Sequence, residues 1–325
     1  MTNFEIYKKT LPFSFISAGL ALISIAIFVG CPVAGYYLAG GTPERAIIGL
    51  VIGFVIGVIL LFVYSYLVLN RFLAGQIAMM TQGVANNKLP DHVVKAGMDE
   101  LKGRFAKITA FFFVTGVIKS MFRQIGRLTG RVGRAIGGQT GEGVASAIDT
   151  GVQVLLGYLC DCCLGWVMYR KNESVTKAAC EGAVIFFKSG KTLFRNIGRI
   201  FGMGIASLLV IGGAVFGGLY AVSGLFPTAF QDLSKTITDL LLKNGGQPVE
   251  FITNPNLLKV YACALVAIAI WSMFHSVLVR PFILVGVLRN FIEVGKNDIP
   301  TEADIKQLEK RAPKIAKLRA KMDAR

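Results

Sequence analysis

The stretch that decides the fold is AIIGLVIGFVIGVILLFVYSYLVLN, residues 46–70, which contains no charged side chain. A helix needs about 20 apolar residues to cross the hydrocarbon core of a bilayer, and this stretch is long enough. Three other charge-free stretches have the same character, at residues 10–43, 200–231 and 260–279. The sequence therefore predicts an all-α, polytopic helical membrane protein with four clear spans.

The overall composition agrees with this class. Of the 325 residues, 54% are hydrophobic and 17% are charged, whereas an ordinary soluble domain carries about 25% charged residues. The formal net charge is +16. Lys and Arg accumulate on the cytoplasmic side of membrane proteins, where they also meet anionic lipid. The basic charge therefore indicates an inner membrane surface, and no nucleic-acid partner is expected.

Hydropathy and charge divide the chain into four segments. Residues 1–70 form an N-terminal transmembrane hairpin, and residues 71–199 form a basic amphipathic and re-entrant helical region at the inner face. Residues 200–290 hold a C-terminal transmembrane pair with a loop at 224–259, and residues 291–325 form a charged tail. This loop is nearly charge-balanced, while several Lys and Arg precede the third span. The positive-inside rule therefore predicts the loop outside and both termini in the cytoplasm.

Two local patterns carry structural expectations. Gly49, Gly53 and Gly57 recur at four-residue spacing, and such a row of small residues lets a neighbouring helix approach closely. The sequence NNKLP at residues 86–90 interrupts a mixed polar stretch. We therefore expect one helix, a turn and a short second helix within residues 71–104.

A row of arginines indicates contact with anionic lipid. Its spacings of four, four and three residues place it on one face of a helix, which also carries an apolar face and belongs in the interface plane. The members are Arg123, Arg127, Arg131 and Arg134. The flanking apolar stretches, residues 105–122 and 144–169, either both span the membrane or both lie at its inner face. The inner face is favoured, because an arginine row outside would violate the positive-inside rule.

Three stretches follow one another after residue 105. They are Cys160-Asp161-Cys162-Cys163, then SVTKAACEGAVIFFKSGKTLFRNIGRIFGMGIASLLVIGG at residues 174–213, then FHSVLVRPFILVGVLRNFIEVGKND at residues 274–298. Their order and pattern resemble the C-terminal half of the choline transporter-like family. Members of that family are longer and have more spans, so the resemblance covers about half of this chain. It implies a solute transporter.

The cysteines beside Asp161 could form a metal site, a disulfide, a lipid anchor or a helix contact. Zinc needs four ligands, but the other cysteines lie in different segments and the only histidines are His92 and His275. A disulfide needs an oxidising compartment, and this segment is expected to face inward. S-acylation beside a basic helix stays open. Packing of small thiols is the expected role, and no metal or cofactor is predicted.

Five polar or aromatic residues form a candidate substrate site. A carboxylate inside an apolar segment is costly, so Asp161 either holds a cationic substrate or neutralises an arginine such as Arg170. Aromatic faces attract a quaternary ammonium by cation–π interaction, although aromatic residues in spans more often serve packing. The candidate residues are Asp161, Tyr261, Trp271, Phe274 and His275.

Two functions remain. The first is a transporter or channel for a small organic cation or another solute, which is favoured because intramembrane Asp161, His275 and Arg280 are costly unless used. The alternative is a non-transporting membrane protein that binds anionic lipid headgroups or a partner complex through its basic amphipathic helices. A homo-oligomer is compatible with both. An enzyme is not expected, since the sequence contains no G-x-S-x-G or H-E-x-x-H pattern and residues 137–143 lack the Lys of a phosphate-binding loop.

Overall fold

A computed structural model of the protein describes residues 1–39, 43–102, 154, 157–188, 197–225, 228–243, 245, 247, 250–311, 316 and 320. All regular secondary structure over these residues is helical. Four helices are long and apolar enough to cross a membrane, and they cover Asn3–Ala39, Ile48–Asn86, Gly198–Ser223 and Pro255–Asn297. The prediction of an all-α polytopic membrane protein with four spans is confirmed.

The chain forms two compact units, of which the first contains Met1–Ile197 and Pro281–Arg325 and the second contains Gly198–Arg280. These units are defined by contacts between residues, whereas the four segments expected from the sequence follow hydropathy and charge. The boundaries of the two units therefore do not test the boundaries of those four segments, which stay a prediction.

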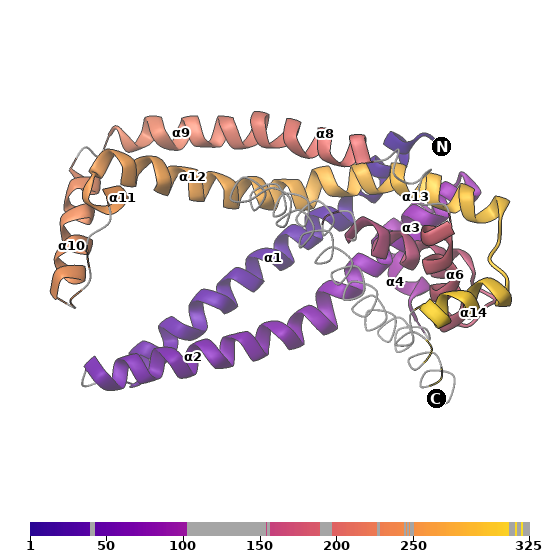
Figure 1. Ribbon diagram of the computed structural model, residues 1–325, viewed down its shortest axis with the longest axis horizontal. Coiled ribbons are helices and arrows are strands. Elements are labelled where there is room, and N and C mark those ends of the chain that lie inside the picture. Colours follow the sequence, from indigo (N-terminus) through magenta and orange to yellow (C-terminus); the bar gives the residue numbers. More distant parts are fainter. Residues whose placement is uncertain are drawn as a thin grey trace. The chain divides into compact units, whose positions relative to one another are not determined.

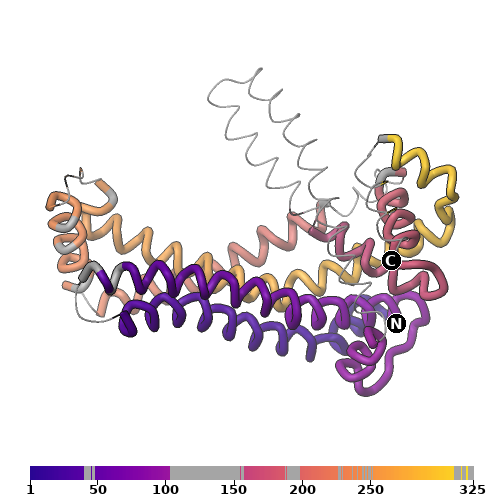
Figure 2. The backbone as a smooth tube through the Cα atoms, turned by 90° about the horizontal axis from the view of Figure 1, so that it is seen from below, coloured from indigo at the N-terminus to yellow at the C-terminus, as the bar shows by residue number. Residues whose placement is uncertain are grey.

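The first unit contains a close helical hairpin of α1 (Asn3–Ala39) and α2 (Pro43–Tyr64), seen side by side in Figure 2. A Cβ atom built on Gly49 would collide with the backbone carbonyl of Gly35, and one built on Gly53 with that of Cys31. The glycine row therefore brings the two helix backbones into contact, as its spacing predicts. Tyr64 adds a polar link, since its Oη donates to the carbonyl of Leu20 at 3.1 Å.

The second span does not end where its apolar residues end. A π-helical turn, η1 (Ser65–Leu69), leads from α2 directly into α3 (Asn70–Asn86). The helix stops at Asn87, whose φ of 53° lies in the left-handed region that Asn tolerates better than most residues. After a turn, α4 (Val93–Glu100) follows. The expected helix, turn and short helix are confirmed over the described residues up to 102.

The remaining described helices of the first unit pack together, and we call this part of the chain the head domain (Figure 1). It consists of residues 3–14 of α1, residues 70–102 with α3 and α4, residues 157–188 and residues 281–311. The last two ranges contain the helix 157–169, α6 (Val175–Lys188), most of α13 (Arg280–Asn297) and α14 (Glu302–Arg311). Its core is apolar, and the largest fully buried side chains of the described residues all lie here: Ile6, Phe13, Ile77, Met79, Met80, Leu164, Trp166, Ile185, Ile283 and Phe291.

Small residues let the helices of the head domain pack closely. A Cβ atom on Gly97 of α4 would come within 2.6 Å of the Phe13 ring. A Cβ atom on Gly295 of α13 would come within 2.5 Å of Trp166 and 2.7 Å of Ile185. Interiors this dense leave no room for an added methyl group without a shift of the neighbouring atoms. These contacts join α1 to α4 and α13 to both the helix 157–169 and α6.

Three span-bearing helices have one end in the head domain. The buried residues of α1 fall within 6–14, those of α3 within 74–83 and those of α13 within 281–295. The helices Asn3–Ala39, Ile48–Asn86 and Pro255–Asn297 have 37, 39 and 43 residues. At 1.5 Å per residue they measure roughly 55–65 Å, about twice the hydrocarbon thickness of a bilayer. Each of these helices is therefore longer than one crossing of the hydrocarbon core requires.

The second unit is a pair of spans with a helical connection. The first span runs through α8 (Ile197–Ser207), the π-helical turn η2 (Leu208–Gly212) and α9 (Gly213–Ser223). The second begins with α12 (Pro255–Phe274) and continues through the π-helical turn η3 (His275–Val279). Figure 1 shows α9 and α12 side by side, and α10 (Ala229–Lys243) and α11 (Glu250–Thr253) connect them. Asn254 caps α12, because its side chain accepts the backbone N–H of Asn256 at 3.0 Å.

Candidate functional site

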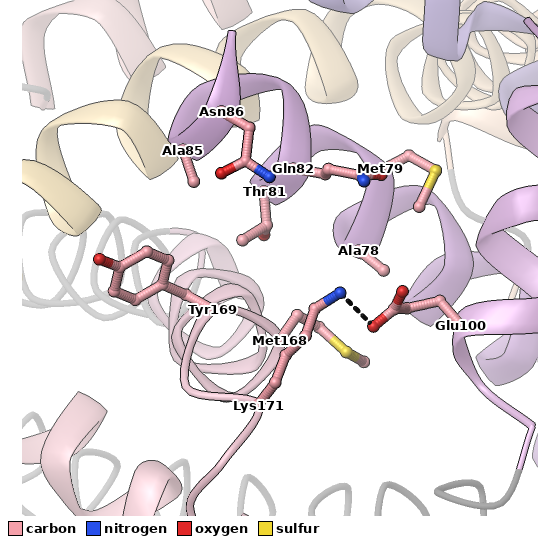
Figure 3. A pocket seen from close by; sticks show the side chains of 10 residues that line it. All are labelled: Ala78, Met79, Thr81, Gln82, Ala85, Asn86, Glu100, Met168, Tyr169 and Lys171. Atoms are coloured by element: carbon pink, nitrogen blue, oxygen red, sulfur yellow. Dashed lines mark ion pairs between the residues drawn. The ribbon is translucent and has the colours of Figure 1, made fainter. Parts of the chain in front are cut away.

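A cavity of about 260 Å³ lies in the head domain between α3, the end of α4 and the helix 157–169 (Figure 3). Thr81, Gln82 and Asn86 line it from α3, and two of these residues carry side-chain amides. Glu100, the last residue of α4, and Lys171, in the turn after the helix 157–169, line it as well. The cavity therefore combines neutral hydrogen-bonding groups with one charge of each sign.

The two charges of the cavity form an ion pair. Lys171 Nζ lies 2.6 Å from Glu100 Oε1, and the two side chains are 50% and 24% exposed. Ion pairs that water reaches contribute about 0–1 kcal/mol, because solvent screens the attraction and ordering the side chains costs entropy. The pair can therefore open at little cost when another charged molecule offers the same partners.

The hydroxyl of Thr81, beside the cavity, is buried next to Gly165. Thr81 is 2% exposed, and its Oγ1 has no hydrogen-bond partner among the residues that the structure describes. In Figure 3 its side chain points from α3 toward Met168 and Tyr169. A buried polar group without a partner costs about 1–3 kcal/mol. No sequence pattern singles out this residue, because a threonine within a helix is ordinary until its neighbours are known.

A second polar group of the head domain is a buried carboxylate network. Glu181 of α6 is fully buried, and its Oε2 accepts Trp166 Nε1 at 2.9 Å and Arg170 Nε at 3.1 Å. The Arg170 guanidinium also donates to Glu173 Oε1 at 3.2 Å. A hydrogen bond from Lys177, 3.0 Å away, lowers the pKa of Glu173. Both oxygens of Glu181 have donors, so we interpret this network as structural.

Glu181 was not among the residues predicted to have a role. Its position in the sequence could have indicated a buried carboxylate, because Glu181 is the only charged residue between Lys177 and Lys188 in an otherwise apolar and small-residue stretch. One of the two expected roles of Asp161 was to neutralise an arginine such as Arg170. The described contacts of Arg170 are instead with Glu173 and Glu181. α6 is buried over nearly all of its described residues, although Lys188 at its end is exposed.

The cysteine cluster packs inside the head domain. Cys160, Cys162 and Cys163 are buried in the helix 157–169. Cys163 contacts α6 where Gly182 leaves room, since a Cβ atom there would lie 3.3 Å from its Sγ. Burial raises the pKa of the Cys162 and Cys163 thiols well above the usual range. Over the described part of the chain, no three His, Cys, Asp or Glu side chains are placed to hold a metal ion.

The candidate substrate residues fall in both units. Asp161 is 6% exposed and lies within the head domain, between the buried cysteines. The other four belong to the second unit, where the rings of Trp271 and His275 lie 5.2 Å apart. Tyr261 and Phe274 are exposed on α12. The arginine row at residues 123–134 lies outside the described residues.

Trp271 and His275 lie beside two π-helical turns of the second unit. Trp271 Nε1 donates to Ser207 Oγ at 3.1 Å, immediately before η2 begins. A Cβ atom on Gly204 would lie 3.9 Å from His275 Nε2, where η3 begins. Within the described residues, η1 is a third such turn in another span. Single π-helical turns occur often at functional sites, so this place is a second candidate site.

Comparison with known proteins identifies no relative. No family model matches the chain, and neither a curated protein nor a solved structure matches it. The resemblance to the choline transporter-like family therefore stays a prediction, as do the roles of the candidate residues.

Proposed function

We propose that the protein is a non-transporting integral membrane protein whose head domain binds at the membrane surface. The observation that supports this function is the distribution of buried side chains. In the four spans, at most 17% of the most apolar window is buried within the structure. The head domain, in contrast, buries α6 on nearly all sides and holds the largest core side chains. The close packing of the described chain is therefore concentrated in the head domain, and we infer that this domain lies outside the bilayer.

A substrate path through a membrane needs helices that enclose it. Polar substrate sites in membrane proteins face the interior of a helix bundle or a water-filled cavity. In the first unit α1 and α2 form a single hairpin whose large apolar side chains, such as Phe28, Phe54 and Phe62, are exposed. In the second unit the same holds for Leu209 and Leu265. Such faces suit contact with lipid or with a second copy of the chain.

Anionic lipid is the partner that this proposal favours. Lys8 and Lys9 are exposed on α1, and Ser14, only five residues further, is the last residue of α1 that the head domain buries. The two lysines thus lie close to the junction of head domain and bilayer. Each basic residue near an anionic leaflet contributes about 1 kcal/mol of binding free energy. The arginine row would add to the same surface if it lies at the inner face.

Retention of lipid by the purified protein tests the proposal. The full chain is reconstituted in vesicles of equal neutral and anionic lipid and extracted, and the lipid that remains bound is identified by mass spectrometry. We expect anionic lipid to be enriched, and Lys8→Gln with Lys9→Gln to reduce the enrichment by roughly fivefold or more, since about 1 kcal/mol per charge is a factor of about five. Raised salt should act in the same direction.

The matched control is Lys88→Gln with Lys306→Gln, which removes two exposed charges from other parts of the head domain. These residues lie in the loop after α3 and on α14. We expect the control to retain anionic lipid like the unchanged protein. Equal retention of neutral and anionic lipid by the unchanged protein would contradict the lipid part of the proposal.

Transport of a small organic cation is the second candidate function. It is favoured by the π-helical turns in three spans and by the pair of Trp271 and His275 beside Ser207. Uptake of labelled choline into vesicles that contain the protein distinguishes the two functions. We expect no uptake above that of protein-free vesicles. Uptake that is lost in Trp271→Leu would instead establish transport and overturn the first proposal.

A further inference from the structure

We propose that α10 lies in the plane of the membrane and buries an apolar strip among zwitterionic lipids, at the end where α9 and α12 are connected. The strip consists of Phe230, Leu233, Ile237 and Leu241. Three features of the second unit support this site: the direction of α10, its depth relative to the ends of the two spans, and the exposure of the strip. The site is separate from the head domain, to which the proposed function belongs.

α10 runs across the two spans that it helps to connect. α9, α10, α11 and α12 all belong to the second unit, which contains Gly198–Arg280. α9 and α12 lie side by side in Figure 1, and both Figure 1 and Figure 2 show α10 lying across their direction at the connected end. Transmembrane helices are tilted from the bilayer normal by only about 20° on average. A helix that lies across them therefore lies along the membrane surface.

The depth of α10 follows from the polar residues at the ends of the spans. The ammonium of Lys259 in α12 lies 4.3 Å from the centroid of the Tyr220 ring in α9. Lysine and tyrosine near the ends of spans place their polar groups at the boundary between hydrocarbon and water. α12 begins at Pro255, four residues before Lys259, which is a rise of about 6 Å. The headgroup region of one leaflet is about 5–8 Å thick, so the beginning of α12 lies within it.

Ser234 holds α10 at the same depth. Its Oγ donates to the carbonyl of Ile252 in α11 at 2.6 Å, and the residue is 4% exposed. Ile252 precedes Pro255 by three residues, and α10 also contacts α12 directly. The depth of α10 is therefore that of the headgroups, where amphipathic helices bind with their apolar face toward the acyl chains.

The apolar strip of α10 stays open to the outside of the second unit. Its four residues follow one another at spacings of three, four and four, which places them on one helical face. Leu233 is 44% exposed, and Phe230, Ile237 and Leu241 are partly exposed, so the described residues bury none of the four. The strip adjoins the buried Ser234, on the side of α10 that contacts α11. An apolar face at this depth is stabilised when it enters the boundary between headgroups and acyl chains.

The polar side of α10 carries no net charge. Its exposed charged residues are Asp232 and Asp239 together with Lys235 and Lys243, two of each sign. Leu242 is also exposed on this side and takes no part in the strip. Attraction to anionic headgroups grows with the number of basic residues, so a balanced helix gains little from it. Burial of apolar surface therefore stabilises the bound helix, and zwitterionic lipid is sufficient.

The surroundings of the strip favour lipid over a protein as its occupant. Val222 and Leu225, at the end of α9 and just before α10, are 54% and 75% exposed. The surface of the span that faces lipid therefore continues up to α10. A stable protein interface uses about 20–30 residues on each side, whereas the strip has four. Such a strip is large enough to anchor one helix in a leaflet, and too small to hold a partner protein by itself.

The depth of fluorescent labels on α10 tests the proposal. Leu233→Cys and Ile237→Cys are introduced singly into the full chain with Cys31→Ala and Cys263→Ala, because the described cysteines of the head domain are buried. Each protein is labelled with an environment-sensitive fluorophore and reconstituted in phosphatidylcholine vesicles. Lipids that carry a nitroxide on the acyl chain quench the label from the bilayer, and iodide quenches it from water. We expect both labels to be quenched by the nitroxide lipids and shielded from iodide.

The matched controls are Lys235→Cys and Asp239→Cys, which place the same label on the exposed polar side of α10. These labels should be quenched by iodide. A helix with its side chains is about 10–12 Å across, so labels on the two sides should differ in depth by about 10 Å. Raised salt should leave the depth of the Leu233→Cys label unchanged, because the strip is uncharged, whereas retention of anionic lipid by the head domain should fall.

Two results would overturn the proposal. The first is equal quenching by iodide at the strip and control positions, which would mean that α10 stands free in water. The second is shielding of the strip labels from both nitroxide lipid and iodide, which would mean that a protein, such as a second copy of the chain, covers the strip. Since the lipid-retention experiment uses residues of the head domain, either result leaves the proposed function standing.

Discussion

Replacing Arg170 by methionine should destabilise the head domain strongly. The guanidinium is the cationic partner of Glu181, whose side chain is 1% exposed. Methionine keeps the aliphatic stem but removes the charge, so the buried carboxylate keeps only the N–H of Trp166 as a described donor. An uncompensated buried charge is among the few causes of large single-residue effects.

The expected loss follows from the geometry of this pair. Breaking a buried ion pair by removing one partner costs about 3–5 kcal/mol. Arg170 is 24% exposed, so water can reach part of the site, and we expect about 3 kcal/mol. In a domain of about 60–100 residues, close to the size of the head domain, 1 kcal/mol shifts the unfolding midpoint by about 4–8 °C. The midpoint should therefore fall by about 12–24 °C.

Tryptophan fluorescence provides the assay, because the chain contains only two tryptophans. In a Trp271→Phe background, Trp166 reports the head domain alone, and its indole contacts the network directly. Unfolding is followed with temperature in detergent. The matched control is Lys102→Met, which removes a largely exposed partner of Asp99 and should leave the midpoint almost unchanged.

A second substitution separates the charge effect from general damage. Glu181→Gln in the Arg170→Met background removes the buried charge, while its amide oxygen can still accept the N–H of Trp166. We expect the double variant to regain about 2 kcal/mol. The reasoning is refuted if Arg170→Met unfolds within about 1 kcal/mol of the unchanged protein, or if the double variant is no more stable than the single one.

Three further predictions concern other parts of the chain. Gly53→Val should disrupt the α1–α2 hairpin and lower the unfolding midpoint, whereas Gly30→Val should not, since no atom lies within 4 Å of a Cβ there; equal midpoints would contradict the packing. Burial raises the pKa of Cys162 and Cys163, so their thiolates are scarce at pH 8 and a maleimide should label them only after unfolding; labelling of the folded protein, found by mass spectrometry, would disagree. A peptide of residues 121–138 should bind anionic vesicles in a salt-sensitive way, and equal, salt-insensitive binding to neutral vesicles would end the lipid role of the arginine row.

The spans could be predicted from the sequence because their signal is local. Residues 46–70 are apolar without interruption, and no distant contact is needed to make them helical in lipid. The break at residues 86–90 was predictable for the same reason, since Asn and Pro act on the backbone around them. The row of Gly49 and Gly53 likewise predicted its close contact correctly.

The head domain could not be predicted, because its signal is not local. α3 and α13 continue the apolar stretches with a mixture of polar and apolar residues, and their hydropathy predicts that these residues are exposed. In the structure they are buried against the start of α1 and against α6, which are distant in the sequence. The roles of individual buried polar residues could not be predicted for the same reason. Asp161 could be singled out because its neighbours in the sequence are apolar. Glu181 and Thr81 could not, because the environments of their side chains come from helices that are distant in the sequence.

The most direct test of the account is the side of the membrane on which three exposed positions lie. Single cysteines are introduced at Lys88, Lys306 and Gln247, and intact cells are treated with a maleimide that cannot cross the membrane. The account predicts that Gln247 in the loop is labelled from outside, and that Lys88 and Lys306 in the head domain are labelled only after permeabilisation. Labelling of Lys88 and Lys306 from opposite sides would contradict the existence of a single head domain, and with it the account built on that domain.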